Sequence, residues 1–146
     1  MKRKLIGVVC LTIVMFGCSS ETDQAGTAQM QDLSWVSALF EAVDSGDADA
    51  FVGFMSDDVV FRLRNLDPLY GKEAVHKDIS ELLAGIQGIS HELSRVIAHD
   101  DLVIVQGVVT YTRLDGSTLP CQFVDVWTMR GALIQEYLIY IDNTEL

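Results

Sequence analysis

A single carboxylate stands out on an otherwise apolar strand face. Residues 119–129 are rich in apolar and β-branched types and are predicted to be extended, so alternate side chains share a face. One face carries Cys121, Phe123, Asp125, Trp127 and Met129. Burial among such neighbours would raise the pKa of Asp125, which could then act as a general acid or base near neutral pH. The alternative is a structural Asp125 that accepts a hydrogen bond tying the sheet together.

Cys18 is the second residue whose position indicates chemistry. It follows a basic start (residues 2–4) and an apolar run (residues 5–16), which are typical of a secretory signal and too short to span a bilayer comfortably. The arrangement resembles the lipobox of bacterial lipoproteins, which implies cleavage just before Cys18 and lipid attachment to its thiol. Ser19 then implies an outer-membrane protein facing the periplasm. The alternative is a soluble periplasmic protein, cut later, for example after Ala28.

The charge balance restricts the partners that we expect. The sequence holds 10 Lys and Arg against 21 Asp and Glu, a net charge of −11. Removal of residues 1–17 would leave 7 basic residues against 21 acidic ones, a net charge of −14. Nucleic acid and anionic membrane surfaces would repel such a protein, so we expect no nucleic-acid binding and membrane contact through the lipid anchor only.

The other polar motifs predict neither a metal nor a cofactor. Cys121 would be the one thiol left after processing and lipidation, so a disulfide or a cysteine metal site cannot form. His99, Asp100 and Asp101 are ligand types, but no second cluster at ligand spacing accompanies them, and a turn is the better interpretation. The sequence also lacks a phosphate-binding loop and a nucleophile motif.

The elements that must position Asp125 follow from periodicity. Helical spacing of apolar residues predicts a helix over 33–44, a shorter one after Asp47, and a third over 72–84. Residues 65–71 form a loop. Extended segments are expected at 59–64, 91–98, 102–113, 119–129 and 133–141. Helices first and a strand meander afterwards predict an α+β domain over 32–146, with a signal peptide over 1–17 and a flexible tether over 18–31.

The order of these motifs resembles a known superfamily. Ser-Gly-Asp (45–47) is followed by Met-Ser-Asp-Asp-Val-Val-Phe (55–61), Leu-Tyr-Gly-Lys-Glu-Ala-Val (69–75) and Phe-Val-Asp-Val-Trp (123–127). Over residues 33–142 this pattern is similar to the nuclear-transport-factor-2-like superfamily, in its SnoaL-like polyketide-cyclase and ketosteroid-isomerase branch. The resemblance implies a cone-shaped, cystatin-like fold in which three helices pack on the concave face of a curved, mostly antiparallel sheet. It also implies a deep apolar pocket and dimers through the outer sheet face.

The resemblance also indicates which catalytic positions are altered. The position of the isomerase base falls at Leu63, and that of its oxyanion-binding tyrosine falls at Leu39. The tyrosine and asparagine of the epoxide-hydrolase branch fall at Phe61 and Leu63. Ketosteroid isomerisation and epoxide hydrolysis are therefore not expected, and Asp125 remains as the candidate catalytic group. The ligand-binding residues expected in the pocket are Trp35, Leu39, Phe61, Leu63, Tyr111, Phe123, Trp127, Tyr137 and Ile139.

Three functions fit these residues. The first is an exported domain that binds a small apolar or amphipathic molecule without catalysis. The second is a small cyclase- or isomerase-type enzyme with Asp125 as general acid/base and Tyr137 or Tyr111 as its partner. The third is a scaffold whose outer sheet face, around Val124 and Val126, binds another chain. We expect that face to form a homodimer, and strand alternation predicts that Arg62 and Arg64 also point away from the pocket.

Overall fold

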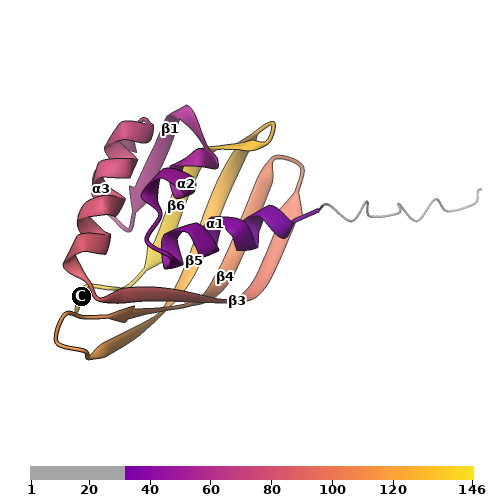
Figure 1. Ribbon diagram of the computed structural model, residues 1–146. Helices are drawn as coiled ribbons and strands as arrows, with labels where there is room; N and C mark the ends of the chain where they lie inside the picture. The colour runs from indigo at the N-terminus through magenta and orange to yellow at the C-terminus, as the bar shows by residue number, and fades with distance from the viewer. Residues whose placement is uncertain (1–31) are drawn as a thin grey trace, which may run out of the picture. The chain divides into compact units, whose positions relative to one another are not determined.

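The computed structural model describes residues 32–146, and the predicted signal peptide, Cys18 and tether lie outside this part of the chain. Three helices and six strands follow one another in the order α1, α2, β1, β2, α3 and β3 to β6 (Figure 1). Their bounds are α1 Ser34–Asp44, α2 Ala48–Gly53, β1 Met55–Leu63, β2 Leu69–Tyr70, α3 Lys72–Gly85, β3 Gly88–His99, β4 Leu102–Thr112, β5 Thr118–Arg130 and β6 Leu133–Ile141. None of these helices is long and apolar enough to cross a membrane.

The strands form one mixed, open sheet in the order β2-β1-β6-β5-β4-β3. All neighbours are antiparallel except β1 and β6, which run parallel with Phe61 opposite Tyr137 and Leu63 opposite Ile139. The sheet curves, and the helices lie over one of its faces (Figure 1). The predicted α+β architecture is therefore confirmed.

The helices are held in place by their apolar sides and by one side-chain cap. Val36, Leu39, Phe40 and Val43 of α1 are all buried, as their helical spacing predicts. The Asp47 carboxylate accepts the backbone N–H of Ala50 at 2.8 Å and caps the start of α2. Both helices are thereby fixed against the concave face of the sheet, which places their aromatic residues over β5 and β6.

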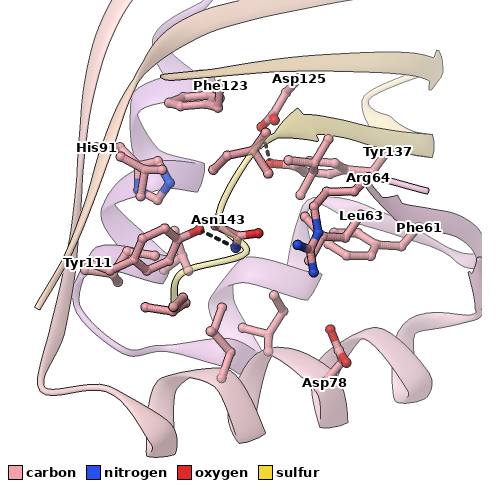
Figure 2. A pocket seen from close by; sticks show the side chains of 18 of the residues that line it. Phe61, Leu63, Arg64, Asp78, His91, Tyr111, Phe123, Asp125, Tyr137 and Asn143 are labelled. Carbon is pink, nitrogen blue, oxygen red and sulfur yellow. Dashed lines mark hydrogen bonds between the residues drawn. The ribbon is translucent and has the colours of Figure 1, made fainter. Parts of the chain in front are cut away.

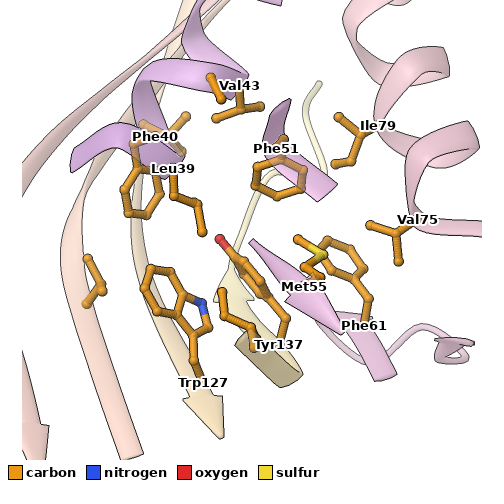
Figure 3. Close-up of a cluster of buried hydrophobic side chains, with 14 of the residues drawn as sticks. Leu39, Phe40, Val43, Phe51, Met55, Phe61, Val75, Ile79, Trp127 and Tyr137 are labelled. Carbon is orange, nitrogen blue, oxygen red and sulfur yellow. The ribbon is translucent and has the colours of Figure 1, made fainter. Parts of the chain in front are cut away.

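The core lies between α1, α2 and the central strands (Figure 3). Trp127 and Tyr137 sit on neighbouring strands with ring centroids 5.2 Å apart, and both are buried. Leu39 and Met55 are fully buried beside them. This apolar layer fills one part of the concave face and forms the rigid support of the site described below.

Two expectations about the first strand need correction. β1 begins at Met55, four residues earlier than the predicted segment 59–64, because its first residues pair with β6 across a register shift. The predicted loop 65–71 contains the two-residue strand β2, in which Leu69 pairs with Phe61. A strand of two residues has no periodic pattern, so alternation alone cannot predict it.

Candidate functional site

A cavity of about 650 Å³ lies between the helices and the concave side of the sheet. All three helices, five strands (β1 and β3 to β6) and the chain end beyond β6 contribute to its wall (Figure 2). The lining residues are Phe40, Val43, Phe51, Phe61, Leu63, Arg64, Asp78, Ile79, Glu81, Leu82, Ile89, His91, Val109, Tyr111, Phe123, Asp125, Tyr137, Ile139, Ile141, Asn143, Thr144 and Leu146. Most of these side chains are apolar or aromatic, so the few polar groups among them determine what the cavity can recognise.

Asp125 is the most deeply buried of these polar groups, with an exposure of 2%. The Tyr137 hydroxyl donates a hydrogen bond of 2.7 Å to its Oδ2, whereas its Oδ1 is buried and has no partner. Burial raises the pKa of Asp125 from 3.8 to about 7, and the hydrogen bond from Tyr137 opposes that rise only in part. The carboxyl group can therefore give or accept a proton near neutral pH, as the strand pattern predicted.

Tyr111 and Asn143 form a second polar pair in the wall. The side-chain Nδ2 of Asn143 donates a long hydrogen bond of 3.4 Å to the Tyr111 hydroxyl. The side-chain Oδ1 of Asn143 is buried without a partner. Burial raises the pKa of Tyr111, so its phenol stays protonated at neutral pH. Tyr111 was predicted as a pocket residue, whereas Asn143 lies beyond the last predicted strand and has no pattern that marks it.

His91 and Asp44 form a third pair, which sequence reasoning missed. The His91 Nδ1 lies 2.5 Å from Asp44 Oδ1, and the His91 backbone N–H donates to Asp44 Oδ2 at 2.8 Å. The carboxylate at the end of α1 therefore fixes the imidazole at the start of β3. Phe40 and Phe123 pack against the ring, with centroids at 4.7 and 5.4 Å. The two partners are 47 residues apart, and only the packing of α1 on β3 brings them together.

Arg64 lines the cavity, which corrects the prediction that it points away from the pocket. Strand alternation holds only while the backbone stays extended, and Arg64 has φ = 56°, in the left-handed region. Its backbone N–H donates to Ile139 O at 2.8 Å and anchors the turn at the end of β1. The side chain consequently leaves the outer face and points into the cavity (Figure 2). Arg62, one residue inside the strand, is exposed as predicted.

The predicted pocket residues divide into two groups. Asp125 and six of the predicted ligand-binding residues line the cavity: Phe61, Leu63, Tyr111, Phe123, Tyr137 and Ile139. Trp35, Leu39 and Trp127 lie outside its lining. The reason is packing, because Trp35 and Trp127 have ring centroids 5.4 Å apart and Leu39 is fully buried beneath them. These three residues belong to the core that supports the cavity.

Within residues 32–146, no group of three or more His, Cys, Asp or Glu side chains could hold a metal ion. His99 and Asp100 form an exposed pair 3.2 Å apart at the β3–β4 turn. The Cys121 thiol is buried, and desolvation raises its pKa, so the reactive thiolate is disfavoured. Among the acidic groups of the cavity wall, Asp125 is the most deeply buried, and Asp78 and Glu81 on α3 are the others.

Comparison with known proteins agrees with this architecture. The curved sheet and its helices are similar in fold to those of a nuclear-transport-factor-2-like protein. The model of the SnoaL-like domain family matches residues 36–137, and the chain belongs to that family. No curated protein matches the sequence. This fold includes cyclases, isomerases and ligand-binding proteins, so membership establishes the architecture and leaves the reaction open.

Solved structures share the fold at low sequence identity. A nuclear-transport-factor-2-like protein from Burkholderia pseudomallei has a TM-score of 0.70 and 18% identity, over 77% of this chain and 91% of that one. TerC, crystallised with polyporic acid, has a TM-score of 0.69 and 19% identity, over 77% and 92%. An epoxide hydrolase from Mycobacterium tuberculosis has a TM-score of 0.65 and 16% identity, over 73% and 79%.

Proposed function

We propose that this protein binds a small apolar or amphipathic molecule in the cavity between its helices and sheet. The observation that carries the proposal is a cavity of about 650 Å³ whose wall is mainly apolar and aromatic, with a few polar groups at defined positions. Pockets of this size and composition are typical of sites for small organic ligands. The buried, unpartnered Oδ1 of Asp125 supplies one polar group that a ligand can satisfy.

Blocking the cavity tests this proposal. Leu63 lines the cavity and is only partly buried, so a Leu63→Trp variant should place an indole in the cavity without disturbing the core. We expect wild-type protein to bind Nile red, a neutral apolar dye, with an increase in dye fluorescence, and the variant to bind at least tenfold more weakly. The matched control is Leu66→Trp, because Leu66 is 54% exposed and lies outside the cavity lining.

Equal dye binding by wild-type protein and a folded Leu63→Trp variant would contradict a cavity site. Native mass spectrometry of the purified wild-type protein adds a second measurement. We expect an extra mass that dissociates on denaturation and is absent from the Leu63→Trp variant. The same mass retained by that variant would also count against the proposal.

Acid–base catalysis is the second candidate function. The observation that favours it is that one cavity wall contains the hydrogen-bonded pair Asp125–Tyr137 and also His91, whose ring is held by Asp44 from outside the lining. A pKa of about 7 suits Asp125 to proton transfer at neutral pH. A bound carbonyl compound should then exchange its α-hydrogens for deuterium in D₂O, as measured by NMR, and Asp125→Asn should abolish that exchange without preventing binding. Exchange unchanged in the variant would exclude Asp125 as the catalytic group.

Export and lipid anchoring are proposals that rest on residues 1–18. If Cys18 carries a lipid, Cys18→Ser should move the protein from the membrane fraction to the soluble periplasmic fraction and leave its circular dichroism unchanged. Ser19 supports an outer-membrane location. Equal membrane association of the wild-type and Ser proteins would contradict the anchor.

A further inference from the structure

Arg64 is the only Lys or Arg among the residues of the described domain that line the cavity. The left-handed turn at φ = 56° and the backbone hydrogen bond to Ile139 direct its side chain inward. An arginine is always charged at physiological pH. The cavity therefore contains one permanent positive charge next to a largely apolar wall.

The guanidinium of Arg64 has no partner within residues 32–146. Its Nε is buried without a hydrogen bond, and no carboxylate lies within ion-pair distance of it. Two other arginines of the described domain, Arg130 and Arg113, differ in this respect. Arg130 forms a two-point contact with Asp58, and Arg113 donates to Ser117 and to the backbone of Glu145.

The two acidic residues in the cavity wall do not neutralise Arg64. Asp78 and Glu81, both on α3, line the cavity and make no ion pair with the guanidinium. Desolvation, followed by the nearby Glu81 carboxylate, raises the pKa of Asp78, which is the opposite of what a close cation would do. The Arg64 charge contributes to lowering the pKa of Asp142, beyond β6, but no ion pair joins these two side chains, so the guanidinium remains available to a ligand.

We propose that the cavity selects an amphipathic monocarboxylic acid, whose carboxylate binds the guanidinium of Arg64 while its apolar body lies against Phe61, Phe123 and Ile139. This inference rests on the proposed ligand-binding function and names the class of ligand. A planar guanidinium binds a carboxylate through two parallel hydrogen bonds, and a low-dielectric wall strengthens them. One arginine matches the single negative charge of a monocarboxylate. Polyanions such as nucleotides are disfavoured, because the net charge of −11 and the carboxylates of Asp78 and Glu81 would repel them.

A pair of probes with the same ring system tests the inference. We would titrate the full-length protein, at pH 7.5 and low salt, with 2-naphthoate and with 2-naphthalenemethanol by isothermal calorimetry. The two probes have nearly the same shape and differ in charge. Wild-type protein should bind the acid at least tenfold more tightly than the alcohol. Arg64→Gln should remove this preference by weakening acid binding at least tenfold, with a change of less than twofold for the alcohol.

Two further variants control for charge and fold. Arg62→Gln removes an exposed arginine from the same strand and should leave both affinities unchanged. Arg64→Lys keeps the charge without the planar fork, so we expect it to retain part of the preference. If Arg64→Gln does not fold, the ratio of the acid affinity to the alcohol affinity, measured for wild-type protein and for Arg64→Lys, still tests the role of Arg64.

The possible outcomes separate the two proposals. Binding of neither probe would count against ligand binding in the cavity and therefore against both. Equal binding of acid and alcohol by wild-type protein would preserve the cavity site and overturn the role of Arg64. A preference for the acid that persists in a folded Arg64→Gln variant, or that disappears in Arg62→Gln, would overturn it as well.

Discussion

Burial controls the chemistry of Asp125. The side chain has one oxygen bonded to Tyr137 and one without a partner, and the resulting pKa of about 7 lies within the physiological range. A buried carboxyl group that stays protonated in the folded state makes the stability of the protein depend on pH. This dependence can be measured without knowing the ligand.

We expect Asp125→Asn to remove a loss of stability that wild-type protein shows as pH rises from 4 to 7. Well below pH 3.8 the carboxyl group is protonated in both the folded and the unfolded chain. Between its unfolded pKa of 3.8 and its folded pKa of about 7, only the unfolded chain releases the proton, so unfolding becomes easier as pH rises. At 1.36 kcal/mol per pH unit, the difference reaches about 4 kcal/mol.

Urea unfolding of both proteins at pH 4.5, 6 and 7.5 measures this difference, and the subtraction cancels the contributions of the other acidic residues. We expect the Asn variant to become more stable relative to wild type as the pH rises. Asp125→Leu serves as the control, because it also lacks the titrating group but leaves the Tyr137 hydroxyl without its acceptor, so it should be about 1–3 kcal/mol less stable than Asp125→Asn at every pH. A difference between wild type and Asn that does not change with pH would contradict the raised pKa.

For single residues, the sequence predicted the direction of a side chain correctly only where the residue lies in a regular strand. Alternation along 119–129 placed Asp125 in the wall correctly, because β5 stays regular there. The same rule misplaced Arg64, where a left-handed residue ends β1. His91 and Asp44 could not be paired from sequence at all, since their contact depends on how α1 packs against β3.

Gly107 marks a close backbone approach within the β3–β4 pair. Gly107 on β4 lies opposite Leu93, beside a register shift in β3. A methyl group at this position would overlap the carbonyl oxygen of Glu92 and would lie 2.9 Å from Cε1 of Phe123. The glycine therefore allows the Phe123 ring to lie against the strand and leave the cavity open.

Gly107→Ala should destabilise the protein by about 1–3 kcal/mol, because backbone and ring must both move to accommodate the methyl group. The displaced Phe123 ring should also weaken Nile red binding. Gly85→Ala provides the comparison, since no atom lies within 4 Å of the added carbon and alanine favours the helix by up to about 1 kcal/mol. Urea midpoints measure both effects, and a Gly107→Ala variant as stable as wild type would contradict the close approach.

Most element types and positions were predictable because the helices and long strands are strongly periodic. The relative direction of paired strands was harder to predict. Nothing in 55–63 or 133–141 indicates that these strands lie parallel, since both are amphipathic segments that could pair in either direction. The curved sheet with helices on its concave face came from the resemblance to the SnoaL-like branch, and the family match confirms that resemblance.

The outer face of the sheet carries a row of apolar side chains. Ile97, Ile104, Val126 and Leu138 occupy paired positions across four strands, on the side of the sheet away from the helices. Ile97 is 46% exposed and Tyr140 58%. A contiguous apolar surface of this kind is typical of a protein–protein contact, so we propose a homodimer through this face.

Val126→Glu should convert the dimer to a monomer or to insoluble protein, because a charge would be buried in the middle of the contact. Analytical ultracentrifugation at micromolar concentration measures the change. Leu114→Glu is the matched control, since Leu114 is 72% exposed at the tip of the β4–β5 hairpin and should leave the mass unchanged. Wild-type protein that sediments as a monomer would contradict the proposal.

The parallel pairing of β1 with β6 also has a consequence for folding kinetics. β1 ends at Leu63, and its parallel partner β6 begins only at Leu133. Their pairing therefore closes a far longer loop than the hairpins that connect β3, β4, β5 and β6 in turn. Such non-local pairings form slowly. Phe61 and Leu63 meet Tyr137 and Ile139 across this pairing, so the pocket wall should be completed late. A ligand bound there should then slow unfolding more than it speeds folding.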